Sequence, residues 1–157
     1  MKKILIIGVI VALFATATGV AYTKDIAVIV NKENTTSEVS YRELEKIFKQ
    51  EKQFWENGGK IYIIMPESKS LQKEVILKKI YKMSEQELKR FWLAKIFKGE
   101  ITSFPKVLSS NESIKLFVRE IPDAIGLIEV EFNDDTVKAL KIDGRLPAQE
   151  GYALNED

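Results

Sequence analysis

The stretch "KIYIIMPESKSLQKEV", residues 60 to 75, decides the fold of this chain. Lys60 to Met65 is an apolar run that predicts a strand, and the apolar spacing from Ile76 to Tyr81 predicts a helix. Between them lies Ser68-Lys69-Ser70. A strand-to-helix loop of this kind can hold phosphate or a similar anion, because the first-turn amides and the positive end of the helix dipole face the ligand. The alternative is that the serines only cap the helix.

Strand and helix patterns alternate on both sides of this stretch. Asp25 to Val30 is a β-branched run suited to a buried strand, and a helix is predicted from Tyr41 to Lys49. Capping-box spacing marks the starts of helices at Ser40 to Glu43, Ser84 to Glu87 and Ser109 to Glu112. This alternation predicts an α/β fold with a mostly parallel sheet flanked by helices.

The C-terminal part of the chain contains two further strand patterns. Ala124 to Phe132 and Thr136 to Asp143 are candidates for a C-terminal antiparallel hairpin, with a polar turn between them. Gly126, inside the first run, indicates close approach of another backbone. One domain is therefore predicted over residues 25–150, followed by a tail at residues 151–157.

The N-terminus has the pattern of an export signal. Lys2 and Lys3 precede an apolar run from Ile4 to Phe14, and small residues follow it. Residues 1–21 are therefore predicted to be a signal peptide, cleaved after Ala17 or Ala21, and the protein is expected to be periplasmic or extracellular. The alternative is an uncleaved membrane anchor, because this uncharged segment is close to the length that crosses a bilayer.

The composition excludes several classes of function. The chain has no cysteine and no histidine, so disulfides, catalytic triads and ordinary zinc sites are absent, and we expect a non-enzyme without cofactors or metals. Lys and Arg number 24 against 23 Asp and Glu, which gives no general attraction to nucleic acid. Glu129 and Glu131 alternate along a predicted strand and are expected on its solvent face.

Several motifs occur in an order that resembles the small PBP-like domain proteins related to substrate-binding proteins of phosphate ABC importers. These motifs are a helix with Ser, Glu-Leu and Ile-Phe, a tryptophan before Gly, an "FW" helix ending in F-x-G, and an "AIG" strand. The matching residues are Ser40, Glu43, Leu44, Ile47, Phe48, Trp55, Asn57, Gly58, Phe91, Trp92, Phe97, Gly99, Ala124, Ile125 and Gly126. The resemblance covers about residues 25–144 and implies a single type II periplasmic-binding-protein lobe that binds phosphate or another small oxyanion.

The resemblance also identifies where this chain departs from the phosphate-binding pattern. Its relatives have an arginine and then Ser-Gly-Thr in the loop after the second strand, whereas this chain has Glu67 and then Ser68-Lys69-Ser70. The polar loop Thr35, Thr36 and Ser37 follows the first strand and is a candidate for the second part of an anion site at the same sheet edge, with dimerisation as one way to close the site. The alternative for these three residues is a solvated loop. The alternative is a non-transport envelope module that binds another protein.

Four aromatic positions complete the predictions. Trp92, together with Phe91 and Phe97, recurs at helical spacing and is predicted to pack in the core. Trp55 lies in a polar stretch beside a turn, so we predict that it is exposed and contacts a partner protein.

Overall fold

The computed structural model describes residues 25–155. The predicted signal peptide or anchor lies outside the described residues. Within the described part, no helix is both long and apolar enough to span a bilayer.

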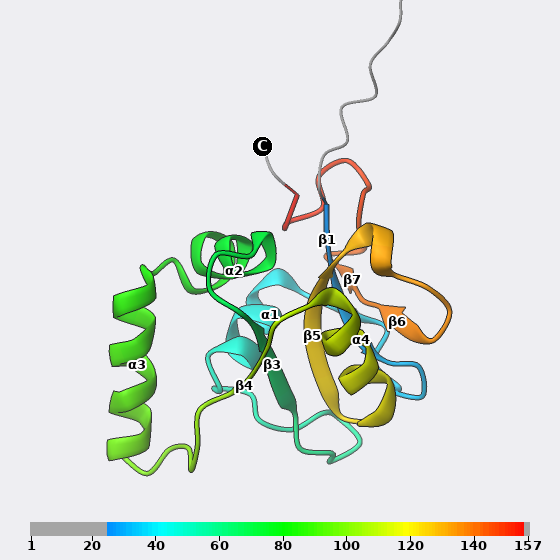
Figure 1. Ribbon diagram of the computed structural model, residues 1–157. Helices are drawn as coiled ribbons and strands as arrows, with labels where there is room; N and C mark the ends of the chain where they lie inside the picture. Colours follow the sequence, from blue (N-terminus) through cyan, green and yellow to red (C-terminus); the bar gives the residue numbers. More distant parts are fainter. Residues whose placement is uncertain (1–24, 156–157) are drawn as a thin grey trace, which may run out of the picture.

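A five-stranded sheet forms the centre of the domain (Figure 1). In spatial order its strands are β4 (Lys106–Leu108), β3 (Tyr62–Pro66), β5 (Ala124–Glu129), β1 (Ile26–Asn31) and β6 (Val137–Ala139). β3 runs parallel to β4 and to β5, and β1 runs antiparallel to both of its neighbours, β5 and β6. Four of the five strands therefore point in one direction, and the prediction of a mostly parallel sheet is confirmed.

The predicted C-terminal hairpin is wrong. β5 and β6 do not pair with each other, because β1 lies between them and forms hydrogen bonds with both. Every residue of β1 is buried. Such a strand is most stable in the middle of the sheet, where both of its edges are hydrogen-bonded and both of its faces are covered. The chain then continues into β7 (Lys141–Ile142), which pairs in parallel with the short β2 (Glu38–Val39).

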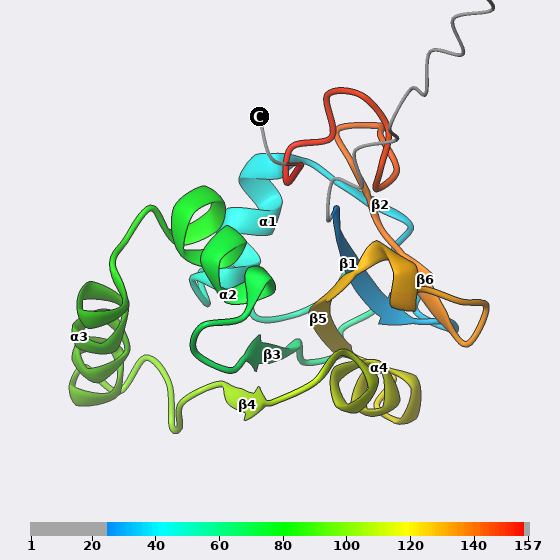
Figure 2. The same cartoon turned by 45° about the horizontal axis from the view of Figure 1, so that its top comes forward.

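Helices cover both faces of the sheet (Figure 2). The helices of the described part are α1 (Tyr41–Phe48), α2 (Leu71–Val75), the π-helix η1 (Ile76–Tyr81), α3 (Glu85–Phe97), α4 (Asn111–Glu120) and the short 3-10 helix η2 (Val130–Phe132); α3 lies to one side of the sheet. α1 and η1 pack on one face, where Phe48, Ile76 and Ile80 are buried. α4 packs on the other face through Ile114 and Val118.

Serine caps fix the starts of the helices. Ser40 accepts a hydrogen bond from the Glu43 amide at 3.1 Å, and Ser84 forms the predicted capping box with Glu87. The third box is shifted by one residue from the prediction: Ser110, and not Ser109, is the cap of α4, and its partner is Ser113. The serine hydroxyl at the third helical position makes the same reciprocal bonds as a carboxylate there.

Gly126 allows α4 to lie directly against β5. A Cβ atom at this position would lie 2.8 Å from Cγ2 of Ile114, which is closer than van der Waals contact permits. The element that approaches Gly126 is α4, and it does so through the Ile114 side chain and not through its backbone.

The predicted C-terminal tail is wrong for most of its length. Tyr152 and Leu154 are buried in the main hydrophobic cluster, and the backbone oxygen of Asn155 accepts a hydrogen bond from Lys79 at 2.8 Å. The domain therefore extends past residue 150, because two apolar side chains in a polar terminal sequence are enough to hold it on the core.

We predict that this terminal segment contributes to global stability. Replacement Leu154→Ala, at a side chain that is 1% exposed, should lower the free energy of unfolding by about 2 to 5 kcal/mol. The matched change Leu146→Ala, at a side chain that is 39% exposed, should cost less than about 1 kcal/mol. Urea unfolding followed by circular dichroism measures both, and equal effects would show that the segment is not part of the core.

Candidate functional site

A hollow of about 140 Å³ lies at the carboxyl ends of β3, β4 and β5. Its wall is formed on one side by the loop after β3 and on the other by the start of α4. The lining residues are Pro66, Glu67, Ser70, Gln72, Leu108, Ser109, Ser110, Asn111, Ile114 and Glu129. Open α/β sheets bind ligands at this edge, because loops and helix N-termini converge there.

The loop after β3 has a defined backbone conformation. Ser70 caps α2. Its hydroxyl accepts a hydrogen bond from the Lys73 amide at 3.1 Å and donates one to the backbone oxygen of Glu67 at 2.9 Å. Ser68 donates a hydrogen bond to the Glu85 carboxylate at the start of α3. Lys69 adopts a left-handed conformation with φ of 70°, which is normally favourable only for glycine. Lys69 therefore gives the loop a backbone shape that glycine would normally provide.

A polar network faces this loop across the hollow. The buried Gln72 side chain donates a hydrogen bond to Oδ1 of Asn111. Asn111 Nδ2 lies 3.1 Å from Glu129 Oε1, and the Glu129 amide donates to Asn111 Oδ1 at 2.9 Å. These bonds tie the first residue of α4 to the last residue of β5 and to α2, and they set the width of the hollow.

Sequence reasoning missed this network. Glu129 was expected on a solvent face, but it is the last residue of β5 and its side chain is hydrogen-bonded beside the hollow. Ser109, Ser110 and Asn111 were read only as the start of a helix. The signal that could have identified them is their position at the carboxyl end of a parallel strand.

The charges at this edge are mixed. Glu67 and Glu129 line the hollow, whereas Lys69 lies in the adjoining loop. Two carboxylates disfavour an anion, and a lysine and helix-start amides favour one. The edge can therefore form hydrogen bonds with a small polar ligand. Whether it favours an anion or a cation depends on the charges of Glu67 and Glu129 relative to that of Lys69.

The second predicted part of the site lies elsewhere. β1 runs antiparallel to β5, so the loop after β1 leaves the sheet at the edge opposite the hollow. Asn31, at the end of β1, donates hydrogen bonds to the backbone oxygens of Val118 and Arg119 near the end of α4, whereas the hollow lies at the start of α4. The prediction that Thr35, Thr36 and Ser37 share an edge with Ser68-Lys69-Ser70 is wrong.

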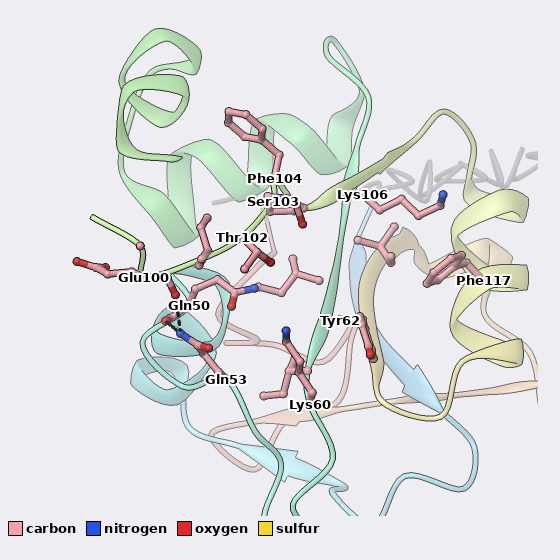
Figure 3. Close-up of a pocket in the computed structure, with 16 residues that line it drawn as sticks. Gln50, Gln53, Lys60, Tyr62, Glu100, Thr102, Ser103, Phe104, Lys106 and Phe117 are labelled. Carbon is pink, nitrogen blue, oxygen red and sulfur yellow. Dashed lines mark hydrogen bonds between the residues drawn. The ribbon is translucent and has the colours of Figure 1, made fainter. Parts of the chain in front are cut away.

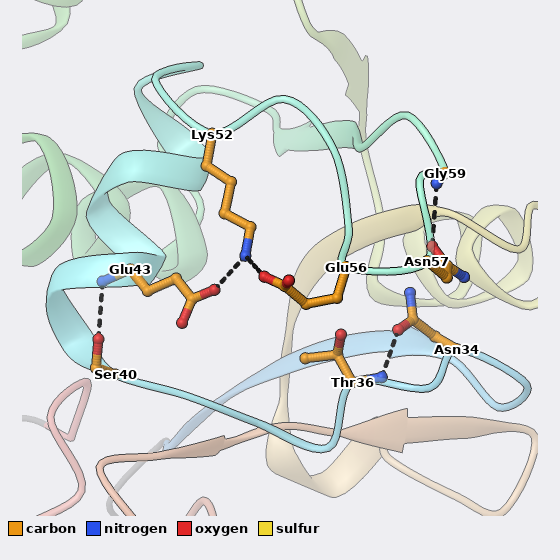
Figure 4. A network of polar contacts seen from close by, with 8 residues as sticks. All are labelled: Asn34, Thr36, Ser40, Glu43, Lys52, Glu56, Asn57 and Gly59. Atoms are coloured by element: carbon orange, nitrogen blue, oxygen red, sulfur yellow. Dashed lines mark hydrogen bonds and ion pairs between the residues drawn. The ribbon is translucent and has the colours of Figure 1, made fainter.

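The loop after β1 is organised by its own polar contacts (Figure 4). Asn34 Oδ1 accepts a hydrogen bond from the Thr36 amide at 2.9 Å. Across from this turn, Lys52 Nζ lies 2.5 Å from Glu43 Oε1 and 2.7 Å from Glu56 Oε1. Two hydrogen bonds raise the pKa of the Lys52 ammonium above its ordinary value. The bond to Glu43 has the larger effect and the bond to Glu56 the smaller one. These ion pairs stabilise the region around α1.

Trp55 is not exposed, so this prediction is also wrong. Its side chain is 3% exposed, and its indole Nε1 donates a hydrogen bond to the Asp123 oxygen at 3.1 Å. The tight turn that follows, with Gly58 at φ of 87°, folds the polar stretch back and places the ring against the core. A side chain buried to this extent offers no surface to a partner protein.

A second hollow, of about 340 Å³, lies at the amino ends of β3 and β4 (Figure 3). Gln50, Gln53 and Lys60 approach it from one side, and Thr102 approaches from the segment after α3. Gln53 Nε2 donates to the Gln50 and Glu100 oxygens at 3.3 and 3.4 Å. The side-chain amide of Gln53 therefore donates its hydrogen bonds within the chain. This second hollow lies at the sheet edge opposite the loop after β3.

Metal binding receives no support in the part of the chain that the structure describes. No group of three or more Asp and Glu side chains there is arranged to hold an ion.

Comparison with solved structures identifies the fold. The chain is similar to a phosphate ABC transporter substrate-binding protein from Clostridium perfringens, solved with bound phosphate, with 21% identity, a TM-score of 0.62, and coverage of 76% of this chain and 45% of that one. It is also similar to an ABC-type phosphate transport receptor from Vibrio cholerae, with 20% identity, a TM-score of 0.67 and coverage of 83% and 53%. PstS from Borrelia burgdorferi matches with 18% identity, a TM-score of 0.66 and coverage of 85% and 55%.

These comparisons show that the chain has the α/β fold of a periplasmic-binding-protein lobe, as the sequence motifs implied. The chain spans about half the length of the solved proteins it matches. The first two of these proteins are described as a substrate-binding protein and a transport receptor. No protein-family model and no curated protein sequence matches the chain.

We predict that Asn111 holds the hollow in shape by keeping a neutral donor beside Glu129. Replacement Asn111→Asp removes the 3.1 Å hydrogen bond and places two carboxylates together, which should cost about 1 to 3 kcal/mol of stability at pH 7. Repulsion between two carboxylates disappears when one of them is protonated, so the cost should shrink as the pH falls toward the ordinary range of carboxylic acids, about 4.

Urea unfolding at pH 7 and near the carboxyl pKa measures this dependence. The matched control is Asn57→Asp, because Asn57 is exposed and its side-chain oxygen, which accepts from the Gly59 amide at 3.0 Å, is retained in aspartate. An equal loss in both variants, or a loss that does not depend on pH, would contradict the role of Asn111.

Proposed function

We propose that this chain is an exported, solute-binding-type domain that binds a small oxyanion, with phosphate as the first candidate, at the carboxyl edge of β3. The observation that carries the proposal is the loop Ser68-Lys69-Ser70, in which Lys69 has the left-handed φ of 70°. A left-handed residue bends the chain, so that backbone amides beside it can face a bound anion.

The fold supports the same location. The loop adjoins the hollow at the carboxyl ends of three parallel strands, opposite the start of α4. The likeness to substrate-binding proteins of phosphate transporters supports solute binding as the general function. Export is proposed on the N-terminal sequence pattern alone.

The carboxylate of Glu67 limits the affinity of this edge for an anion. Glu67 stands next to the loop, and no arginine lies between Met65 and Gln72 to offset it. Repulsion between a carboxylate and an anion at a partly exposed site is on the order of 1 kcal/mol, which corresponds to about fivefold in the dissociation constant. The proposal therefore implies weak binding that is improved by removing negative charge.

We predict that Glu67→Gln binds phosphate about fivefold more tightly than the wild-type protein, and that Lys69→Glu binds it more weakly. Glu51→Gln is the matched control, because Glu51 is exposed and lies outside the hollow, and it should leave affinity unchanged. Isothermal titration calorimetry with phosphate and then sulfate on the purified protein provides the measurement. No heat with either anion, for wild type and for Glu67→Gln alike, would overturn the oxyanion proposal.

A second candidate function is a protein-binding module of the cell envelope on a single lobe. The specific observation in its favour is that both Glu67 and Glu129 line the edge where an anion is expected. Carboxylates at a concave edge suit the amine and guanidinium groups of a protein partner better than they suit phosphate. Titration with a lysine- or arginine-containing peptide would separate the two candidate functions. Only the protein-binding function predicts that Glu67→Gln weakens binding of the peptide.

A further inference from the structure

A groove of about 580 Å³ lies between the inner face of α3 and β4, the strand at the edge of the sheet. Figures 1 and 2 both show α3 to one side of the sheet, across from β4. Ligand sites in proteins have volumes of about 300 to 1,000 Å³. The groove is therefore large enough for a small organic molecule.

The walls of the groove are mostly apolar. Leu88 and Trp92 of α3 and Met65 of β3 line it, and these side chains are otherwise buried in the core. Phe104 and Val107 line it from the side of β4 and are 49% and 58% exposed. An apolar group bound in the groove would cover these two exposed side chains, which stabilises a complex in proportion to the area removed from water.

The wall that α3 provides is held in place by aromatic contacts. The rings of Trp92 and Phe91 lie edge-on to the Tyr81 ring of η1, at centroid distances of 6.0 and 6.1 Å. Burial of Trp92 agrees with the sequence prediction, whereas Phe97 is 86% exposed, so the prediction that Phe97 packs in the core is wrong. The groove is thus formed before any ligand binds.

The groove has a polar end and an apolar end. Phe104 precedes β4, whereas Ser68 follows β3, and the two strands are parallel, so these residues lie toward opposite edges of the sheet. Along α3, Glu85 at the start accepts a hydrogen bond from Ser68, and Trp92 comes two turns later. Lys73 belongs to α2, which begins just after the loop that contains Ser68, so its side chain reaches the groove from the polar end.

The charges of the groove favour an anion. Two lysines, Lys73 and Lys89, and one glutamate, Glu85, line it, which leaves one positive charge in excess. Glu85 opposes an anion, but it lies one helical turn from Lys89 and accepts the hydrogen bond from Ser68. Lys73 is half-buried, and no carboxylate of the described residues forms an ion pair with it. Its ammonium group is therefore available to an anionic ligand.

The polar end of the groove adjoins the proposed oxyanion site. Pro66 lines both the groove and the hollow of about 140 Å³, and Ser68 of the anion loop lines the groove. We propose that the ligand is an organic oxyanion, such as a phosphate monoester, whose head group lies at the loop after β3 beside Lys73 and whose alkyl or aryl group lies in the groove. This inference rests on the proposed oxyanion function and adds to it the class of the ligand.

Isothermal titration calorimetry on the full-length protein compares methyl phosphate with butyl phosphate, which have the same head group. Each fully buried methylene improves the dissociation constant about fourfold, so three additional methylenes that are partly buried should make butyl phosphate bind about tenfold more tightly. Equal affinities would overturn the inference and leave oxyanion binding in place. No heat with inorganic phosphate or with either ester would overturn both proposals.

Butanol tests the need for the anionic head group, because it carries the same alkyl chain without a charge. It should give no saturable heat at concentrations at which butyl phosphate saturates the protein. If butanol binds as tightly as butyl phosphate, the groove takes apolar molecules irrespective of charge, and the assignment of an anion is wrong.

Two variants locate the two ends of the ligand. Phe104→Ser should reduce the preference for butyl over methyl phosphate and leave the affinity for methyl phosphate unchanged, whereas Phe97→Ser, outside the groove, should keep the preference. Lys73→Gln should weaken both esters about fivefold, and Lys78→Gln, at an exposed position outside the groove, should weaken neither. Equal effects of a variant and its control would contradict the proposed orientation.

Trp92 provides a second measurement, because a bromine atom in contact with an indole ring quenches its fluorescence. The variant Trp55→Phe leaves Trp92 as the only tryptophan of the chain, and circular dichroism shows whether it is folded. 4-Bromophenyl phosphate should quench the emission in a saturable way, whereas phenyl phosphate should not. Binding of both esters by calorimetry without any quenching would place the aryl group outside the groove and would overturn the inference.

Discussion

The position of β1 in the middle of the sheet is the constraint on which the rest of the structure depends. All six of its residues are buried, and it pairs with β5 on one side and β6 on the other. Its antiparallel direction sends the loop after it to the edge away from the hollow. The hollow is consequently built only from β3, β4, β5 and the helices that follow them.

The contact between α4 and β5 determines the shape of that hollow. Gly126 lets α4 approach β5 closely, and Asn111 at the start of α4 then reaches Glu129 and Gln72. This geometry places a carboxylate where the anion loop opens. The fold therefore combines a left-handed residue in the loop after β3, on which the proposed anion site rests, with carboxylates that disfavour an anion.

α3 completes the core on one side only. Its inner face contributes Trp92 to the main hydrophobic cluster, whereas Phe97 at its end is 86% exposed. The chain spans about half the length of the solved proteins it resembles.

The sequence by itself determined the local elements. Apolar periodicity located β1, β3 and the main helices, and serine caps at Ser40 and Ser84 marked two helix starts, because these signals act over a few residues. The motif order indicated the lobe, and the serines after β3 indicated one half of the candidate site.

Only the tertiary structure decided which elements meet. The pairing of β6 with β1 instead of β5, the burial of Trp55 and Leu154, and the exposure of Phe97 all depend on contacts between residues far apart in the chain. Periodicity shows that a helix has an apolar face but not how many neighbours cover it. For the same reason, only the packing of α4 against β5 brings Asn111 within hydrogen-bond distance of Glu129.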